Sequence, residues 1–204
     1  MMLIGRFGSP FVRRVGVTLK HYGLKFEHNN ISTATDRPGV VKFNPLGRVP
    51  ALVTDDGDTI VDSAAIIDYL DEVAGSSKSL TPAKGEERRK VNLAVAIAVG
   101  ACEKAVGTIY EKSKRPAEKV HQPWLDQLDS QAADGLKALE AMNPSPWLAG
   151  PNMTQADVTA VCVYDFIKSA CGHVAPDGRF PKLEALSKRC NAMPAFGETV
   201  PPKA

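Results

Sequence analysis

Residues 7–14 read FGSPFVRR and stand at the junction between a strand pattern and a helix pattern. The apolar run before them, within residues 2–7, predicts a short buried strand. After them, apolar side chains at helical spacing over residues 10–22 predict a helix. Ser9 and Pro10 are residue types preferred at the N-cap and at the first helical position, so a strand-to-helix turn is predicted at this point.

Strand and helix signals continue to alternate up to a Gly- and Ser-rich linker at residues 75–79. The predicted strands are 25–31, 49–54 and 59–61, and the predicted helices are 40–43 and 62–73. The last two strands are separated by a turn and are expected to form a hairpin. This order of elements predicts a compact α/β domain over residues 1–77.

From residue 84 onward the signals are helical. The predicted helices are 86–114, 117–142, 154–170 and 180–193. The first has apolar residues almost all round its centre, so it should be covered on several sides by its own domain or by a partner subunit. Thr154 and Asp157 predict a capping box at the start of the third helix. Residues 84–204 are therefore predicted to form an all-α domain, with Tyr110, Trp124, Tyr164 and Phe166 in its core.

Composition excludes several classes of function. A net charge of +2, with both signs interspersed, is far from the basic footprint of a nucleic-acid-binding protein. The four cysteines form no Cys-x-x-Cys pair and no zinc-ligand spacing, so no metal site is predicted. The longest uninterrupted apolar run, residues 94–101, is too short to span a bilayer, and no leader pattern is recognised. We therefore expect a cytoplasmic protein without a membrane or nucleic-acid partner.

Five segments in order resemble the cytosolic glutathione S-transferase family, and within it serine-type bacterial members. They are LIGRFGSPFVRRVGVTLKHYGL at 3–24, NPLGRVPALV at 44–53, DGDTIVDSAAIIDYLDE at 56–72, PWLAGPNMTQADVTA at 146–160 and CNAMPAFGET at 190–199. The resemblance implies a thioredoxin-like glutathione-binding domain at 1–77 and an all-helical domain at 84–204 that lines a hydrophobic electrophile site. It also implies a cytoplasmic homodimer that uses glutathione as co-substrate and needs no metal.

Ser9 has two interpretations. The residues alone favour a structural N-cap, whereas the resemblance implies that its hydroxyl activates the glutathione thiol. Lowering a thiol pKa by about two units requires roughly 2.7 kcal/mol of preferential thiolate stabilisation. A hydrogen bond to a charged group supplies ~1.5–3 kcal/mol and a helix N-terminus ~0.3–1 kcal/mol, so both together suffice. A hydroxyl can accept and donate at once, so the two roles are compatible. Phe11 or a backbone amide of the same turn is an alternative contact to sulfur.

The resemblance implies further glutathione contacts at two other segments. It implies a cis Val49–Pro50 bond, with the Val49 backbone pairing with the cysteinyl backbone of glutathione. Arg48 is a candidate partner of the glycyl carboxylate, or else a solvent-facing arginine. From the residues alone, Asp62 and Ser63 are a helix cap. The resemblance places the γ-glutamyl carboxylate on the amide and hydroxyl of Ser63, and its α-amino group near Asp62.

The resemblance implies an enzyme, a glutathione transferase of detoxification that directs the glutathione thiolate at a hydrophobic electrophile. The alternatives are a glutathione-dependent peroxidase, a cis–trans isomerase of the maleylacetoacetate type, and a non-enzymatic binding module. Thiol–disulfide exchange is disfavoured, because Ser9 stands where a nucleophilic cysteine is needed. Arg13 and Arg14 are interpreted as a solvated helix face, with Arg14 as a candidate for an interdomain salt bridge. The four histidines are expected at the surface without partners.

Overall fold

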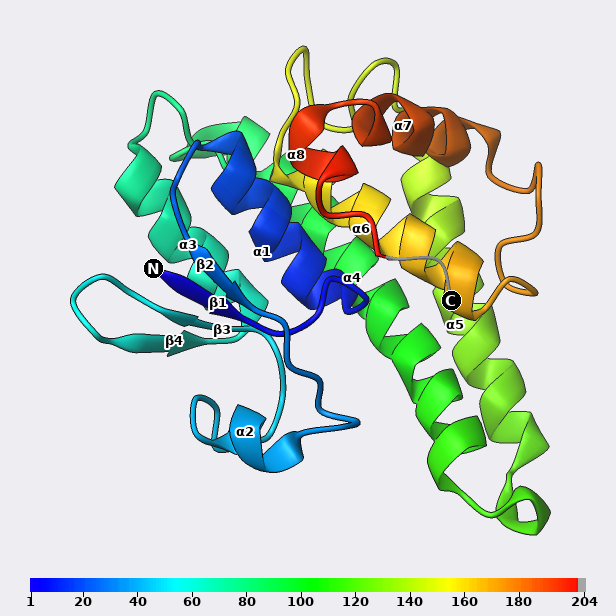
Figure 1. Cartoon of the computed structure of the whole chain (residues 1–204). Coiled ribbons are helices and arrows are strands. Elements are labelled where there is room, and N and C mark those ends of the chain that lie inside the picture. Colours follow the sequence, from blue (N-terminus) through cyan, green and yellow to red (C-terminus); the bar gives the residue numbers. More distant parts are fainter. Residues whose placement is uncertain (202–204) are drawn as a thin grey trace. The chain divides into compact units, whose positions relative to one another are not determined.

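The computed structural model describes residues 1–201, and its chain divides into two compact units (Figure 1). The first contains Met1–Ala83 together with the described residues from Cys190 onward, and the second is Lys84–Arg189. The predicted domain limits, 1–77 and 84–204, differ from this division at residues 190–201, which belong to the first unit. The glutathione-binding and electrophile-binding roles given to the two domains remain predictions.

A four-stranded sheet forms the centre of the first unit. Its strands are β1 (Met2–Ile4), β2 (Glu27–Asn29), β3 (Ala51–Val53) and β4 (Thr59–Val61), in the order β2-β1-β3-β4. β1 is parallel to β2 and antiparallel to β3, so that Leu3 pairs with His28 on one side and with Leu52 on the other. The hairpin of β3 and β4 was predicted. The strands are shorter than predicted, and β1 ends at Ile4 because Gly5, at φ +123°, turns the chain out of the sheet.

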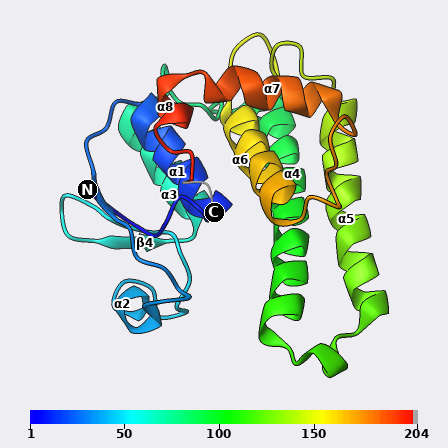
Figure 2. The ribbon, with the colours of Figure 1, turned by 45° about the vertical axis from the view of Figure 1, so that its right-hand side comes forward.

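Four helices lie wholly within the described part of the first unit. They are α1 (Pro10–His21), α2 (Arg37–Val41), α3 (Ser63–Ala74) and α8 (Pro194–Gly197). α1 and α3 lie side by side on one face of the sheet, and α2 lies beyond the other face (Figures 1 and 2). The resulting core consists of Leu3, Val12, Val15, Leu19, Leu52, Ile66, Ile67 and Leu70. This arrangement is the predicted thioredoxin-like sheet domain.

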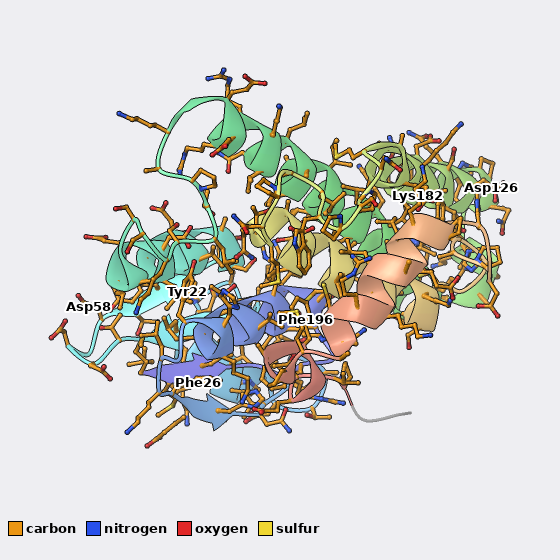
Figure 3. The ribbon with its side chains drawn as sticks, turned by 90° about the horizontal axis from the view of Figure 1, so that it is seen from above. Tyr22, Phe26, Asp58, Asp126, Lys182 and Phe196 are labelled. Atoms are coloured by element: carbon orange, nitrogen blue, oxygen red, sulfur yellow. The ribbon has the colours of Figure 1, made fainter. Side chains whose placement is uncertain are left out.

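Two features of the first unit were not predicted. α2 begins earlier than the predicted turn at 40–43, because Asp36 accepts a hydrogen bond from the Gly39 amide at 2.9 Å and caps the helix. α8 packs against α1 and is too short to show a periodic signal. Its Phe196 is fully buried and lies next to α1 (Figure 3). α8 therefore covers a side of α1 that the local pattern leaves without a partner.

The second unit is helical, as predicted. Its helices are α4 (Gly85–Lys114), the single 3₁₀ turn η1 (Ala117–Lys119), α5 (Gln122–Ala141), α6 (Gln155–Ala170) and α7 (Pro181–Asn191), of which α7 extends past the limit of the unit. The prediction of one helix over 117–142 is wrong. The chain restarts at Gln122 because Pro123, which lacks an amide hydrogen, is tolerated only in a first helical turn.

α4 packs against α5 and α6, and α5 approaches it closely (Figure 2). A Cβ on Gly135 of α5 would lie 2.6 Å from the Cβ of Ala101 on α4, so glycine is required for this spacing. On another side of α4, Leu93 is 58% exposed. Within residues 1–201, α4 is the one helix long and apolar enough to cross a membrane by length and composition, because the run at 94–101 is only part of a longer apolar stretch.

The aromatic residues of this unit divide into two groups. Tyr164 is buried as predicted, and Phe166 is partly buried. The prediction is wrong for Tyr110 and Trp124, which are 49% and 42% exposed. Helical spacing shows that side chains share a face but not whether that face is covered, and both residues lie near the connection between α4 and α5.

The predicted capping box at the start of α6 is confirmed. The Thr154 amide donates to the Asp157 carboxylate at 2.8 Å, and the Leu148 amide donates to the other carboxylate oxygen at 2.8 Å. Burial raises the pKa of the Asp157 carboxyl, while these hydrogen bonds act in the opposite direction. Asp157 therefore joins the helix start to the preceding loop.

Candidate functional site

The turn that carries Ser9 is packed against the segment that carries Val49. A Cβ added to Gly5 would lie 2.7 Å from Cγ2 of Val12 and 2.8 Å from Cβ of Val49, so both valines contact this glycine. Gly5 also has a φ of +123°, which side chains of L-residues rarely adopt. The residue at the end of β1 must therefore be glycine for the first turn of α1 and the Val49 segment to meet beside it.

Ser9 is the N-cap of α1, as the residues alone predicted. Its backbone is extended, with φ −82° and ψ 123°, and Oγ accepts a hydrogen bond from the Val12 amide at 3.5 Å. This contact is at the long limit for such a bond and uses Oγ only as an acceptor. The hydroxyl hydrogen is therefore not consumed by the cap. Ser9 and Phe11 are both half-buried at this helix start.

The connection between β1 and α1 is also held from β2. The Phe7 ring stacks on the His28 ring with 4.2 Å between centroids, and His28 Nε2 lies 2.7 Å from the Gly5 carbonyl oxygen. Phe7 also fills the space beside Gly16, where a Cβ would come within 2.4 Å of the ring. His28 is exposed, as predicted, but the expectation that it lacks partners is wrong, because strand pairing of β1 and β2 brings it beside this connection.

The Val49–Pro50 peptide bond is cis, as the resemblance implied. Asn44, which sequence reasoning did not single out, holds the loop that leads into it. Its side-chain amide donates to the Arg48 carbonyl at 2.9 Å, and its side-chain oxygen accepts from the Leu46 amide at 3.0 Å. Asn44 is buried, whereas the Arg48 side chain is exposed. An asparagine directly before a proline was the available sequence signal for a structured turn.

Asp62 caps α3 from an unusual backbone conformation. Its φ is +71° with ψ 133°, and its Oδ1 accepts from the Ala64 amide at 2.8 Å. This region of φ and ψ is close to one occupied almost only by glycine and costs about 1–3 kcal/mol for other residues. Such conformations cluster at ligand-binding positions, where the surrounding structure enforces them. Asp62 combines this strain with an exposed carboxylate at a helix N-terminus.

Ser63, the first residue of α3, is buried and bonded to α1. Its Oγ accepts hydrogen bonds from Arg14 Nε at 3.1 Å and Arg14 Nη2 at 2.7 Å. The amides of a first helical turn have no partners within the helix and attract anions together with the positive end of the helix dipole. The structure thus places a hydroxyl held by a guanidinium at a point suited to a carboxylate.

The interpretation of Arg13 and Arg14 as a solvated face is wrong, because each is only 2% exposed. Arg13 Nη2 donates to Asn191 Oδ1 at 2.6 Å. Arg14 bonds to Ser63 within the first unit, and the expected interdomain salt bridge stays a prediction. α3 and the segment from Asn191 to α8 cover α1 on sides that look polar in the sequence, and no local signal reveals partners so distant along the chain.

Metal binding and cysteine chemistry each require a particular arrangement of side chains. Residues 1–201 contain no group of three or more His, Cys, Asp or Glu side chains arranged to hold a metal ion. All four cysteines are buried and outside disulfide bonds: Cys102, Cys162, Cys171 and Cys190. Burial raises the pKa of the Cys171 thiol, which disfavours the reactive thiolate.

Comparison with known families gives matches in both halves of the chain. Residues 8–73 match the N-terminal domain of glutathione S-transferases, and residues 102–197 match their C-terminal domain. The chain is 29% identical over 206 residues to the uncharacterized GST-like protein YibF of Escherichia coli, with all of both chains covered. It is 28% identical over 210 residues to maleylacetoacetate isomerase of Pseudomonas aeruginosa, covering 98% of this chain and 96% of the isomerase.

Solved structures agree with these matches. A glutathione S-transferase from Methylobacterium radiotolerans, in complex with glutathione sulfonate, superimposes with a TM-score of 0.92 at 25% identity, over 100% of this chain and 95% of the other. A glutathione transferase family member from Pseudomonas fluorescens, with bound glutathione, gives a TM-score of 0.86 at 27% identity, over 99% of both chains.

Proposed function

The chain belongs to the glutathione S-transferase family, and from that premise we propose that it is a glutathione transferase that directs the glutathione thiolate at a hydrophobic electrophile. The observation that carries the proposal is the packing at Gly5. It brings the helix start with Ser9 against the segment with Val49, so a donor for sulfur and a backbone edge for a peptide share one site.

Glutathione is bound along two segments in this proposal. The first-turn amides of α3 and the Ser63 hydroxyl receive the γ-glutamyl carboxylate, while the Asp62 carboxylate faces the α-amino group. The Val49 backbone pairs with the cysteinyl backbone, and Arg48 supplies a positive charge for the glycyl carboxylate. The exposure of Arg48 and Asp62 supports these roles, because both side chains remain accessible to a ligand.

Ser9 activates the thiol by donating a hydrogen bond to the thiolate. The weak cap bond from the Val12 amide supports this role, because it orients Oγ without using its hydrogen. The thiol proton leaves to solvent, and a sulfur electron pair forms the new bond to carbon as the leaving group departs or a strained ring opens. The required stabilisation of roughly 2.7 kcal/mol for a two-unit shift lies within reach of one charged hydrogen bond plus a helix N-terminus. Phe11 lines the same turn.

A second candidate reaction is cis–trans isomerisation of a maleylacetoacetate-type acid. The 28% identity to the Pseudomonas aeruginosa isomerase over nearly both full lengths favours it over peroxide reduction. In this reaction the thiolate adds to the double bond, rotation follows, and the thiolate is expelled, so glutathione is not consumed. Glutathione use thus separates the two candidates, and a chain with neither activity would be a binding module.

We also propose that the protein is a cytoplasmic homodimer that functions in detoxification. The exposure of Leu93 in the apolar central part of α4 supports a partner subunit on that side. Sedimentation of the wild type and of Leu93→Lys tests this arrangement. A shift of the variant from dimer to monomer is expected, and a monomeric wild type at micromolar concentration would contradict the proposal.

The activity is tested by assaying wild type, Ser9→Ala and Ser9→Thr with glutathione and a panel of aryl halides, epoxides, hydroperoxides and maleylacetoacetate. Loss of a charged hydrogen bond predicts a kcat lower by about 10- to 100-fold in Ser9→Ala. The thiol pKa of bound glutathione, read from thiolate absorbance, should rise. Ser9→Thr keeps the hydroxyl and should retain much of the activity. Equal turnover of wild type and Ser9→Ala would remove Ser9 from catalysis.

A further inference from the structure

Arg14 connects the middle of α1 to the first residue of α3. Its guanidinium is buried and donates two hydrogen bonds to one acceptor atom, Ser63 Oγ, at 3.1 and 2.7 Å. α1 and α3 lie side by side, so a long side chain can span them without leaving the core (Figure 2). Guanidinium stays protonated at every accessible pH, so both donors persist.

The two bonds fix the hydrogen-bonding role of Ser63. A hydroxyl has two acceptor lone pairs and one hydrogen to donate. Arg14 occupies both lone pairs, so the remaining capacity of Ser63 Oγ is to donate its hydrogen. Among residues 1–201 the structure gives that hydrogen no acceptor. The hydroxyl is therefore a committed donor, beside first-turn amides of α3 that are also donors.

We infer that Arg14 is a positioning residue that commits Ser63 to donation and thereby makes the site select a carboxylate over a carboxamide at the γ-glutamyl end of glutathione. The inference rests on the proposed function. A carboxylate offers only acceptors, and each donor around it finds a lone pair. A carboxamide carries an NH₂ group, which would face either Ser63 or the helix amides, donor against donor. With both lone pairs of Ser63 occupied, the hydroxyl cannot rotate to accept from that group.

A structural role of Arg14 gives a different pattern. If Arg14 served only to hold α1 against α3, its loss would weaken the binding of both ligands by the same factor. If it commits Ser63 to donation, its loss frees the lone pairs, and the hydroxyl can then accept from an NH₂ group. The ratio of the two affinities therefore distinguishes the roles, whatever happens to stability.

The test is calorimetric titration with glutathione and with its analogue in which the γ-glutamyl α-carboxylate is a carboxamide. The variants are Arg14→Met, Arg14→Lys and Ser63→Ala. Arg13→Met is the matched control, because Arg13 is equally buried on the same helix but bonds to Asn191. Wild type and Arg13→Met should prefer glutathione by about 10- to 100-fold, the range of one hydrogen bond to a charged group.

In Arg14→Met and Ser63→Ala this preference should fall by about tenfold, since the committed donor is lost. Arg14→Lys, which retains a donor and its charge, should recover part of it. If glutathione does not bind to the wild type, both the proposed function and this inference are overturned. If glutathione binds to the wild type and Arg14→Met keeps the wild-type ratio of affinities for glutathione and its carboxamide, only the inference is overturned. If Arg14→Met does not fold, two other results overturn the inference. One is a wild type that binds glutathione and the carboxamide analogue equally well, and the other is a Ser63→Ala variant whose preference equals that of wild type.

Discussion

Replacing Asp62 by glycine should stabilise the protein while weakening its use of glutathione. Asp62 adopts φ +71° and ψ 133°, a conformation available to glycine without strain. The same residue is the proposed neighbour of the glutathione α-amino group. Asp62→Gly therefore relieves the backbone strain and removes the ligand contact together. The free energy of unfolding should increase, while the KM for glutathione should also rise because binding is weaker.

The magnitude follows from three contributions. Relief of the strained conformation adds about 1–3 kcal/mol. The greater freedom of glycine in the unfolded chain subtracts about 0.4–1 kcal/mol. Loss of the cap bond to the Ala64 amide subtracts a few tenths, as is usual when glycine replaces a capping residue. The sum is a gain of about 1 kcal/mol, or a rise in Tm of about 2–4 °C for a chain of this size.

Asp36→Gly is the matched control. Asp36 is also an aspartate N-cap of a helix in the first unit, and its carboxylate accepts from Gly39, but its φ is −143°. Here glycine brings the same losses without relief of strain, so about 1 kcal/mol of stability should disappear. The cap and entropy contributions cancel between the two variants. Their difference in unfolding free energy, about 1–3 kcal/mol, therefore isolates the strain at Asp62.

Urea denaturation followed by circular dichroism measures both free energies, and steady-state kinetics measures the KM for glutathione. An equal loss of stability in Asp62→Gly and Asp36→Gly would refute the strain argument. A stabilised Asp62→Gly with unchanged KM would instead refute the ligand contact and leave the strain intact.

Two further predictions concern the second unit. Gly135→Ala should destabilise the protein by about 1–3 kcal/mol, since the added methyl would meet Ala101 and overpack the helix contact. Gly100→Ala, with open space around it, should instead stabilise α4 by up to about 1 kcal/mol. Thermal unfolding measures both variants, and equal shifts in Tm would contradict the close approach of α4 and α5. For Asp157, the raised folded-state pKa penalises ionisation, so this group's contribution to stability falls as pH rises from the unfolded pKa of about 4 towards the higher folded value. Asp157→Asn should lose that dependence and about 1–3 kcal/mol of stability, because one oxygen acceptor is replaced by a donor; denaturation between acid and neutral pH checks both effects, and an unaltered pH profile would contradict them.

The sequence predicted best those features that short-range chemistry determines. The cap at Ser9, the capping box of α6 and the hairpin of β3 and β4 are local patterns, and each is confirmed. The burial of Arg13 and Arg14 depends instead on which elements cover α1, and those elements lie about 50 and 180 residues further along the chain. A local pattern shows which side chains share a face, whereas the cover over that face is a tertiary property.

The candidate site follows the same division. The local structure at Ser9, Val49 and Ser63 could be predicted because each stands at a helix start or beside a proline, where residue type and geometry are linked, and the family resemblance added their binding roles. Arg14 could not, since nothing near it along the chain calls for a buried cation. Its two bonds to Ser63 nevertheless decide which hydrogen-bonding role that serine plays. Residues that support a site from within the core can therefore set its selectivity without carrying a motif, and the carboxamide titration examines that influence directly.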